Sequence, residues 1–384
     1  MNKIKIGIIG IGNMGTSHAK NFMAGKCPDI ELVAVADTNP DRLLWAEENL
    51  PGVARFATAE EMLDSGLLDA CVVAVPHYDH PRYAMECFKR NIHVIVEKPA
   101  GVYTKAVREM NEAAEKSNVV FAMMFNQRTN PMYIKMREIL QSGELGAIRR
   151  TNWLITNWFR SQYYYDSGAW RATWSGEGGG VLLNQCPHQL DLWQWICGMP
   201  EKIDVKMHFG KWHDIEVEDD VTAYVEYPNG AVGLFITTTA DCPGSNRFEI
   251  TCEKGRMIAE NKRLTITRLS ESLNGFYKND KGAFGAPDKI EEVIEFEDNG
   301  PQHVGVFNAF ANKILGKGEL LAGGEEGING LTLSNAMHLA AFTGKPVTLP
   351  LDEDLYYNEL MKRVKTSRKK EEVKVEVADT SSTY

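Results

Sequence analysis

Short apolar runs rich in β-branched residues recur through the first third of the chain, and a helical pattern follows most of them. The first run covers Lys3–Ile9, and later runs end at Ala36, Val75, Val96 and Met123. Apolar runs of this length are typical of parallel strands buried on both faces, and their alternation with helices predicts βαβ units. The pattern therefore predicts an α/β domain with a doubly wound parallel sheet.

The pattern changes after residue 125. A helix is predicted over Pro131–Gln141, and from residue 203 short apolar stretches alternate with turns such as Pro228-Asn229-Gly230. This alternation favours a mostly antiparallel open sheet, and its outer face is expected to pair with another subunit in a homodimer or homotetramer. The predicted units are residues 1–125 (parallel sheet), 126–364 (α+β) and 365–384 (a charged, frayed tail).

A Gly-x-Gly-x-x-Gly motif joins the first predicted strand to the first predicted helix. In this context Gly10 permits a tight turn, Gly12 lets the backbone approach a pyrophosphate, and Gly15 lets the helix pack on the strand. The helix N-terminus adds free N–H groups and a positive dipole. The motif predicts a dinucleotide site, with Asn13 and Met14 as further cofactor contacts.

Asp37 ends the second predicted strand, about 20 residues after the motif, where a carboxylate typically binds the ribose hydroxyls. It predicts NAD rather than NADP, with Thr38 and Arg42 beside the ribose. Two readings stay open. Arg42 could accommodate a 2′-phosphate, and Asp37, Thr38 or Asn39 could cap the following helix.

Charged and polar residues also follow two later strands. Lys98 comes directly after a buried run, where ligands bind in open α/β sheets, so its ammonium group is predicted to meet the substrate. A solvated strand end is the alternative for Glu97 and Lys98. Two histidines with no third ligand nearby do not predict a metal site. The residues predicted beside the cofactor at this edge are Ala74, Pro76, His77, His80, Glu97 and Lys98.

A glycine-rich stretch (residues 176–180) precedes a second group of polar residues. Asn184, His188 and Asp191 are spaced to share one face of a helix that begins near Asn184. A histidine flanked by polar groups is a candidate acid/base, although a lone helical histidine is also often structural.

Aromatic residues concentrate between residues 152 and 174. Their faces suit sugar rings, so Trp153 and Tyr163 are predicted to contact the substrate together with Asn184 and His188. An aromatic core or a subunit interface would explain the same composition.

Composition excludes several classes of protein. The net charge of −10 argues against nucleic acid as a partner. No apolar run approaches the roughly 18 residues that span a bilayer, and the N-terminus does not resemble a signal peptide. The 7 cysteines are scattered without Cys-x-x-Cys spacing, which favours reduced thiols in the cytoplasm.

The chain resembles the glucose–fructose oxidoreductase / inositol dehydrogenase / rhizopine-catabolism (Gfo/Idh/MocA) family in three stretches, Gly10-Ile11-Gly12-Asn13-Met14-Gly15, Glu97-Lys98-Pro99 and Gly178-Gly179-Gly180…His188-Gln189-Leu190-Asp191. The resemblance implies a Rossmann domain, an α+β domain with an open sheet, and NAD(P)-dependent chemistry on sugars, cyclitols and related polyols. It also implies that Lys98 and His188 meet at the substrate. Positions near the cofactor or substrate would be Asn126, Arg128, Trp170 and Arg171.

The chain departs from this family at one position. Many members carry an aspartate four residues before the histidine, where this chain has Asn184. An amide cannot accept a proton, so the acid/base work falls to His188 and Lys98. Residues 173–177 and 184–188 look like a subgroup that acts on glucosides and anhydrosugars, often at the C3 hydroxyl.

The predicted activity is hydride transfer between NAD and a secondary alcohol of a sugar, glycoside or cyclitol. Two alternatives stay open. One is a glycosidase or lyase that uses NAD catalytically through a transient keto-sugar. The other is a non-catalytic NAD-binding sensor.

Overall fold

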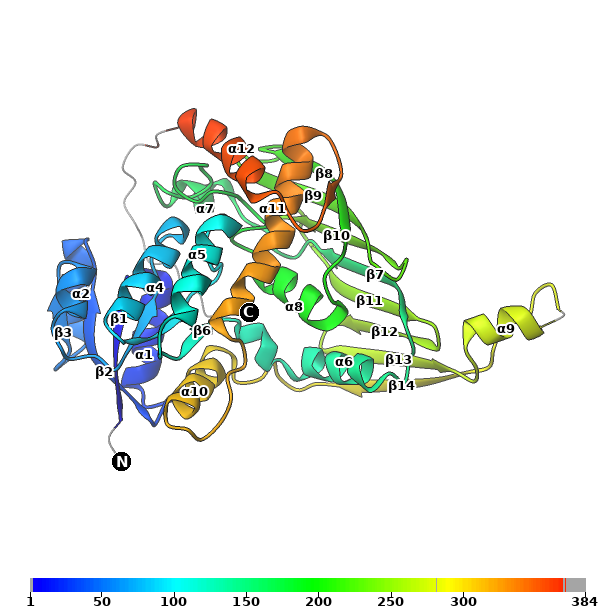
Figure 1. The fold of residues 1–384 in the computed structure, drawn as a ribbon, viewed down its shortest axis with the longest axis horizontal. Helices are drawn as coiled ribbons and strands as arrows, with labels where there is room; N and C mark the ends of the chain where they lie inside the picture. Colours follow the sequence, from blue (N-terminus) through cyan, green and yellow to red (C-terminus); the bar gives the residue numbers. More distant parts are fainter. Residues whose placement is uncertain (1–2, 281, 369, 371–384) are drawn as a thin grey trace.

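The computed structural model describes residues 3–280, 282–368 and 370, which form two sheets with helices around them (Figure 1). None of the described helices is both long and apolar enough to cross a membrane. The predicted tail, residues 365–384, lies mostly outside the described residues. The fold therefore rests on the two sheets and on the helices that connect them.

The first sheet is parallel throughout and has six strands in the order β3-β2-β1-β4-β5-β6. Its central strands are almost wholly buried because helices cover both faces. The chain order reverses between β1 and β4, which opens a crevice at the carboxyl edge of the sheet. The elements are β1 (Ile4–Ile9), α1 (Asn13–Met23), β2 (Ile30–Ala36), α2 (Pro40–Asn49), β3 (Ala54–Phe56), α3 (Ala59–Leu63), β4 (Ala70–Val73), η1 (His77–Asp79), α4 (His80–Lys89), β5 (His93–Val96), α5 (Thr104–Glu115) and β6 (Phe121–Met123).

The second sheet has nine strands in the order β14-β13-β12-β11-β7-β10-β9-β8-β15, and only β7 and β10 pair in parallel. The predicted hairpin around residues 228–230 is present as the antiparallel pair β9 and β10. Burial alternates along β9, since one face packs on helices and the other is exposed. The strands are β7 (Ile148–Ile155), β8 (Lys202–Phe209), β9 (Glu218–Glu226), β10 (Val232–Thr238), β11 (Asn246–Cys252), β12 (Gly255–Glu260), β13 (Arg263–Leu269), β14 (Lys289–Glu295) and β15 (Val347–Thr348).

One long helix, α11 (Gly327–Thr343), runs between the two sheets and joins the domains (Figure 1). Asn335 on this helix donates a hydrogen bond to the Val102 carbonyl and accepts one from the Thr104 N–H. The other helices of this region are η2 (Asn126–Thr129), α6 (Pro131–Ser142), α7 (Gln162–Asp166), α8 (Pro187–Cys197), α9 (Leu273–Asn279), α10 (Gln302–Ile314), η3 (Gly324–Glu326) and α12 (Glu353–Lys365).

Helix α10 belongs to the second half of the chain but packs on the first sheet. Its buried residues Val306, Phe307 and Phe310 share one apolar core with Ile6 and Ile8 of β1. The hydrophobic periodicity of a helix does not specify which sheet it covers, so the sequence could not predict that α10 packs on the first sheet. A boundary at residue 126 therefore does not separate every element of the two domains in space.

Candidate active site

A cleft with a volume of about 750 Å³ lies at the carboxyl edge of the first sheet and is closed by loops of the second domain. We call the lining residues between Ile9 and Lys98 the first wall, and those between Trp158 and His188 the second wall. The residues predicted from sequence that line it are Gly10, Gly12, Asn13, Met14, Asp37, Thr38, Arg42, Ala74, Pro76, His77, His80, Glu97, Lys98, Trp170, Arg171, Asn184 and His188.

The glycine loop of the first wall fits a dinucleotide. Gly10 has a φ of +87°, and a Cβ there would lie 2.6 Å from the Ala74 carbonyl oxygen. A Cβ on Gly15 would lie 1.9 Å from the Gly10 carbonyl oxygen, so Gly15 serves helix packing and does not line the cleft. Nothing lies within 4 Å of a Cβ on Gly12, and no side chain caps the N-terminus of α1. Free N–H groups therefore face open space, as pyrophosphate binding requires.

Asp37 is held in place by backbone N–H groups. Its Oδ2 accepts from Ile11 at 2.9 Å, and its Oδ1 accepts from Asn39 at 2.8 Å. The side chain that caps α2 belongs to Asn39, which accepts from the Asp41 N–H. Asp37 is thus not the helix cap, and its carboxylate lines the cleft where a ribose would lie.

Two histidines line the cleft after β4. Both ring nitrogens of His80 lie 2.7 Å from backbone carbonyl oxygens, those of Pro99 and Val75. The ring of His77 meets Trp170 edge-on at 5.5 Å between centres. Burial lowers the pKa of both imidazoles. Among the described residues, no three side chains of metal-binding type come together.

Glu97 supports the backbone of the neighbouring lysine. Its carboxylate lies 2.6 Å from His18 Nε2 and accepts from the Lys98 N–H at 3.1 Å. Burial alone would raise the pKa of Glu97, but the hydrogen bond and charge of His18 hold it at about 2. Glu97 is therefore an ionised, buried carboxylate that fixes the start of the Glu-Lys-Pro turn.

Lys98 reaches across the cleft from the first wall to the second. Its Nζ donates to the carbonyl oxygen of Asn184 at 2.9 Å. Burial lowers the pKa of Lys98, and the guanidinium groups of Arg160 and Arg171 lower it further. The carboxylates of Glu97 and Glu177 act in the opposite direction without cancelling the effect of burial.

His188 lies in the first turn of α8 and lines the same cleft as Lys98. Burial, together with the charge of Lys98, holds the pKa of His188 well below its ordinary value. The imidazole is therefore neutral at neutral pH and able to accept a proton.

Asn184 lies in a turn before α8, so the predicted helix start near Asn184 is wrong. The helix begins at Pro187, whose missing N–H is tolerated only in a first turn. The Asn184 Nδ2 donates to the buried carboxylate of Glu177, which also accepts from the Ala172 N–H. This contact leaves Oδ1 of Asn184 as a hydrogen-bond acceptor for a bound molecule. Burial raises the pKa of Glu177.

Several predicted substrate contacts do not line the cleft. Trp153 packs in the core of the second sheet, stacked on Phe248 with ring centres 4.1 Å apart. Tyr163 is 66% exposed and lies outside the lining, where its neighbour Tyr164 is found instead. These two predictions failed because a strand alternates its faces and α7 turns successive side chains in different directions.

Two further polar residues are buried away from the cleft. Asn126 donates from Nδ2 to Gln302 at 2.6 Å and is absent from the lining. Asp191 does not share the cleft face of His188, because it forms a bidentate ion pair with Arg128. Both residues bind neighbouring elements, and the sequence pattern could not separate that role from a ligand contact.

Several polar and charged residues at the cleft were not predicted as site residues. Arg160 and Gln185 line the second wall, and Glu177 supports it from behind. The available signal was the position of Arg160 between Trp158 and Tyr164, since arginine interleaved with aromatic residues favours stacking. No local pattern marks Glu177, because its partner Asn184 is brought to it by the fold.

Comparisons with known proteins identify the family of this chain. A family described as "Oxidoreductase family, NAD-binding Rossmann fold" matches residues 4–125, and the "GFO/IDH/MocA C-terminal domain" matches residues 133–258. Together they cover more than half of the chain, so this protein belongs to the GFO/IDH/MocA family of oxidoreductases and its Rossmann domain binds NAD. The predicted family, fold class and cofactor are confirmed.

Named relatives extend over most of the chain. The myo-inositol 2-dehydrogenase of Thermotoga maritima is 26% identical over 281 residues, 70% of this chain and 78% of the relative. The D-glucoside 3-dehydrogenase of Escherichia coli is 25% identical over 373 residues, 90% of this chain and 97% of the relative. The crystal structure of the WlbA dehydrogenase from Bordetella pertussis, with NADH and UDP-GlcNAcA, is 27% identical with a TM-score of 0.77 and covers 91% of this chain and 100% of that chain.

Proposed function

We propose that this protein transfers a hydride between NAD and a secondary alcohol of a sugar, glycoside or cyclitol. The observation that carries the proposal is that Lys98 and His188, one on each wall, line the same cleft as the glycine loop. The named relatives that act on inositol and on glucosides support this substrate class.

The chain's own residues supply the proton chemistry. During oxidation, the neutral imidazole of His188 accepts the proton of the substrate hydroxyl. Lys98 donates a hydrogen bond to the same oxygen and stabilises its developing negative charge. Oδ1 of Asn184 accepts from a neighbouring hydroxyl and orients the ring. Bound NAD supplies the hydride acceptor, and the alcohol becomes a ketone.

We place the oxidation at the C3 hydroxyl of a pyranose ring. The support is the glucoside 3-dehydrogenase relative, which spans 90% of this chain. The position is tested by incubating the protein with NAD and glycosides deuterated at C2, C3 or C4. A slowed turnover with the C3 label alone is expected, and slowing at another carbon contradicts the assignment.

The experiment that tests the function follows NADH absorbance across glycosides, free sugars, inositols and anhydrosugars. Accumulation of NADH with at least one member, lost in Lys98→Ala, is the expected result. Cleavage of a glycoside without NADH accumulation would instead identify a glycosidase or lyase with catalytic NAD. Tight NAD binding without reduction by any member would identify a sensor.

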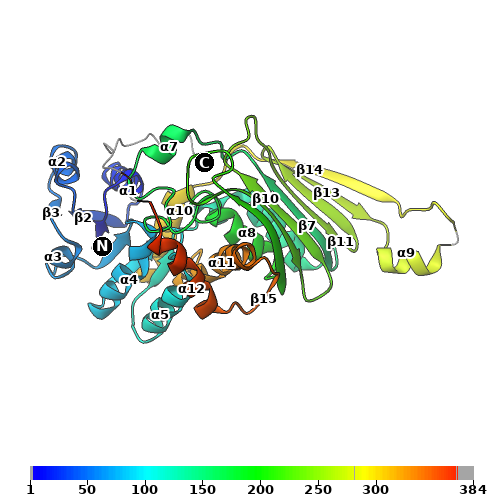
Figure 2. The same ribbon diagram turned by 90° about the horizontal axis from the view of Figure 1, so that it is seen from above.

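We also propose that the second sheet forms the interface of a homodimer or homotetramer. Tyr224 is 40% exposed on its outer face, and α9 lies at the end of an arm that projects from β13 and β14 (Figure 2). Apolar side chains on this arm include Phe284, which is 100% exposed in the single chain, and Ile290, which is 76% exposed. Light scattering should give a mass of two or four chains, and a monomer would contradict the proposal.

The seven cysteines are all free thiols. Free thiols fit a reducing compartment, so we place the reaction in the cytoplasm. Fractionation of the source cells with an antibody against the protein tests this location.

A further inference from the structure

Two arginine and three aromatic side chains alternate along the second wall of the cleft. The guanidinium carbon of Arg160 lies 5.5 Å from the ring centre of Trp158 and 5.0 Å from that of Tyr164. That of Arg171 lies 4.6 Å from Tyr164 and 4.6 Å from Trp170. All five side chains line the cleft, and we call them the arginine ladder.

Neither guanidinium of the ladder forms a direct ion pair with a carboxylate within the described part of the chain, although the charge of Arg171 acts on the buried Glu177. Nη1 of Arg160 donates to the Phe159 carbonyl at 2.9 Å, and Nη1 of Arg171 donates to the Tyr164 hydroxyl at 2.8 Å. By contrast, the structural Arg128 is buried and contacts two carboxylates, those of Asp191 and Glu326. The ladder thus keeps two cations exposed to whatever occupies the cleft.

The positive charge of the ladder acts at the centre of the site. Both guanidinium groups are close enough to Lys98 to lower its pKa. Around Lys98 they are opposed by the carboxylates of Glu97 and Glu177, of which Glu97 also contacts His18. Among the described residues, the lining of the second wall carries two cations, Arg160 and Arg171, and no carboxylate.

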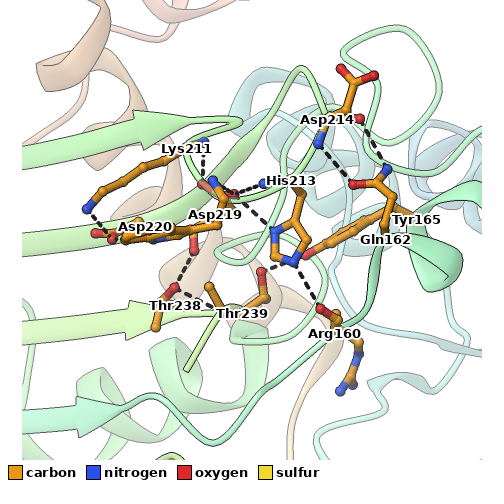
Figure 3. Close-up of polar contacts among 12 residues, drawn as sticks. Arg160, Gln162, Tyr165, Lys211, His213, Asp214, Asp219, Asp220, Thr238 and Thr239 are labelled. Carbon is orange, nitrogen blue, oxygen red and sulfur yellow. Dashed lines mark hydrogen bonds and ion pairs between the residues drawn. The ribbon is translucent and has the colours of Figure 1, made fainter. Parts of the chain in front are cut away.

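The backbone of Arg160 is rigidly held (Figure 3). Its N–H donates to the Thr239 carbonyl at 2.8 Å, and its carbonyl lies 2.9 Å from His213 Nε2. The other ring nitrogen of His213 lies 3.1 Å from the buried carboxylate of Asp219, which also accepts N–H groups of residues 211–213. Figure 3 shows the Arg160 side chain directed away from this cluster. Fixed backbone and stacked side chain together reduce the entropy lost when the guanidinium binds a ligand.

We propose that the arginine ladder binds a negatively charged group on the substrate, a carboxylate or a phosphate, so that the preferred substrate is an acidic sugar. A planar guanidinium matches both groups through paired N–H donors. The glycine loop of the first wall provides a site for the cofactor's pyrophosphate, and Arg171 stays predicted near the cofactor or substrate, so Arg160 is the guanidinium that we assign to the substrate anion. This inference rests on the proposed sugar oxidoreductase function and narrows its substrate class.

Matched neutral and acidic sugars test the inference. The pairs are methyl β-D-glucopyranoside with its uronic acid, and D-glucose with D-glucose 6-phosphate. We expect kcat/KM to be about tenfold or more higher for the acidic member of at least one pair, the usual effect of a charged hydrogen bond. The pair that shows the preference identifies the anion as carboxylate or phosphate. Added salt should reduce the preference.

Variants at Arg160 assign the preference to the ladder. Arg160→Gln should abolish the preference for the acidic sugar with no change in the KM for NAD. Arg160→Lys should show a reduced preference. Arg256→Gln, which removes an exposed arginine on β12, is the matched control and should keep all of it. A preference that survives Arg160→Gln, or a weaker NAD affinity in that variant, would overturn the inference.

The failure of this inference can be told apart from failure of the proposed function. Equal turnover of neutral and acidic sugars leaves the oxidoreductase intact and overturns the acidic-sugar assignment. If no sugar yields NADH, calorimetry of the NADH-loaded protein with the uronide and with glucose 6-phosphate decides the ladder's role. If the wild type binds the acidic sugar and Arg160→Gln does not, the result supports the anion site. If the wild type does not bind it, the anion site is overturned.

Discussion

The two walls of the cleft are built in different ways. On the first wall, turns and strand ends set the geometry, and the side chains of Asp37 and Glu97 bind backbone N–H groups. On the second wall, the side chains other than that of His188 project from the segment 156–186, whose one helix among the described residues is the short α7. A wall whose geometry is set by the backbone suits the dinucleotide, which is always the same ligand. A wall of side chains can be altered by substitution to fit another substrate without a change in the fold. Substrate choice is thus expected to lie in the second wall.

The largest effect is expected where the two walls meet. Lys98→Ala removes the hydrogen-bond donor of the first wall, and His188→Gln removes the base of the second. Each should lower kcat by about 10²–10⁴-fold, the usual contribution of a positioned acid or base. NAD affinity, measured by calorimetry, should stay near the wild-type value because neither change touches the glycine loop. A variant with wild-type turnover would remove that residue from the mechanism.

The glycine loop offers the next sharpest test of the first wall. Gly12→Ala fills open space, so the fold should persist while NAD affinity falls by about tenfold or more. Gly15→Ala places a Cβ 1.9 Å from the Gly10 carbonyl oxygen and should lower the free energy of unfolding by about 3 kcal/mol. Calorimetry with NAD and urea unfolding separate the two outcomes. Equal loss of stability in both variants would show that the two glycines do not have separate roles.

A smaller effect, on the pH dependence of kcat, is expected from Glu177→Gln, which tests the electrostatics of the second wall. Glu177 raises the pKa of Lys98, so its loss should move the alkaline limb of the pH–kcat profile to lower pH. The acid limb belongs to His188, whose lowered pKa places it below pH 6.5, and Glu177 is not among the groups that shift it. That limb is the internal control. An unchanged alkaline limb would show that Glu177 is purely structural.

The first wall was largely predictable from sequence. Turn geometry restricts Gly10 to glycine and close packing restricts Gly15, while strand ends place Asp37 and Lys98 at one edge, so spacing alone carries the information. The residues predicted there line the cleft, apart from Gly15, which packs behind it. The roles of these residues in binding and catalysis stay predictions.

The second wall was less predictable because contacts between distant segments position it. The face of Trp153 depends on the register of β7, and Arg160 is fixed by His213 from a loop 53 residues away. Helix α10 illustrates the same limit for the fold, since its hydrophobic periodicity does not specify that its apolar face packs on the first sheet. Local periodicity predicts that an element exists, but the partner that buries it is a property of the whole chain.

The smallest effect on catalysis is expected from a matched pair of tryptophan variants that separates the second wall from the core behind it. Trp153→Phe removes the hydrogen bond from Nε1 to Asn246 at 2.9 Å and leaves a gap beside Phe248. It should lower the free energy of unfolding by about 2 kcal/mol with no change in the KM for the sugar. Trp158→Phe should raise the KM for the sugar and leave the free energy of unfolding unchanged, because Trp158 lines the cleft and stacks on Arg160. Urea unfolding and initial rates measure the two quantities. A raised KM in Trp153→Phe with unchanged stability would place Trp153 at the substrate and contradict the division between wall and core.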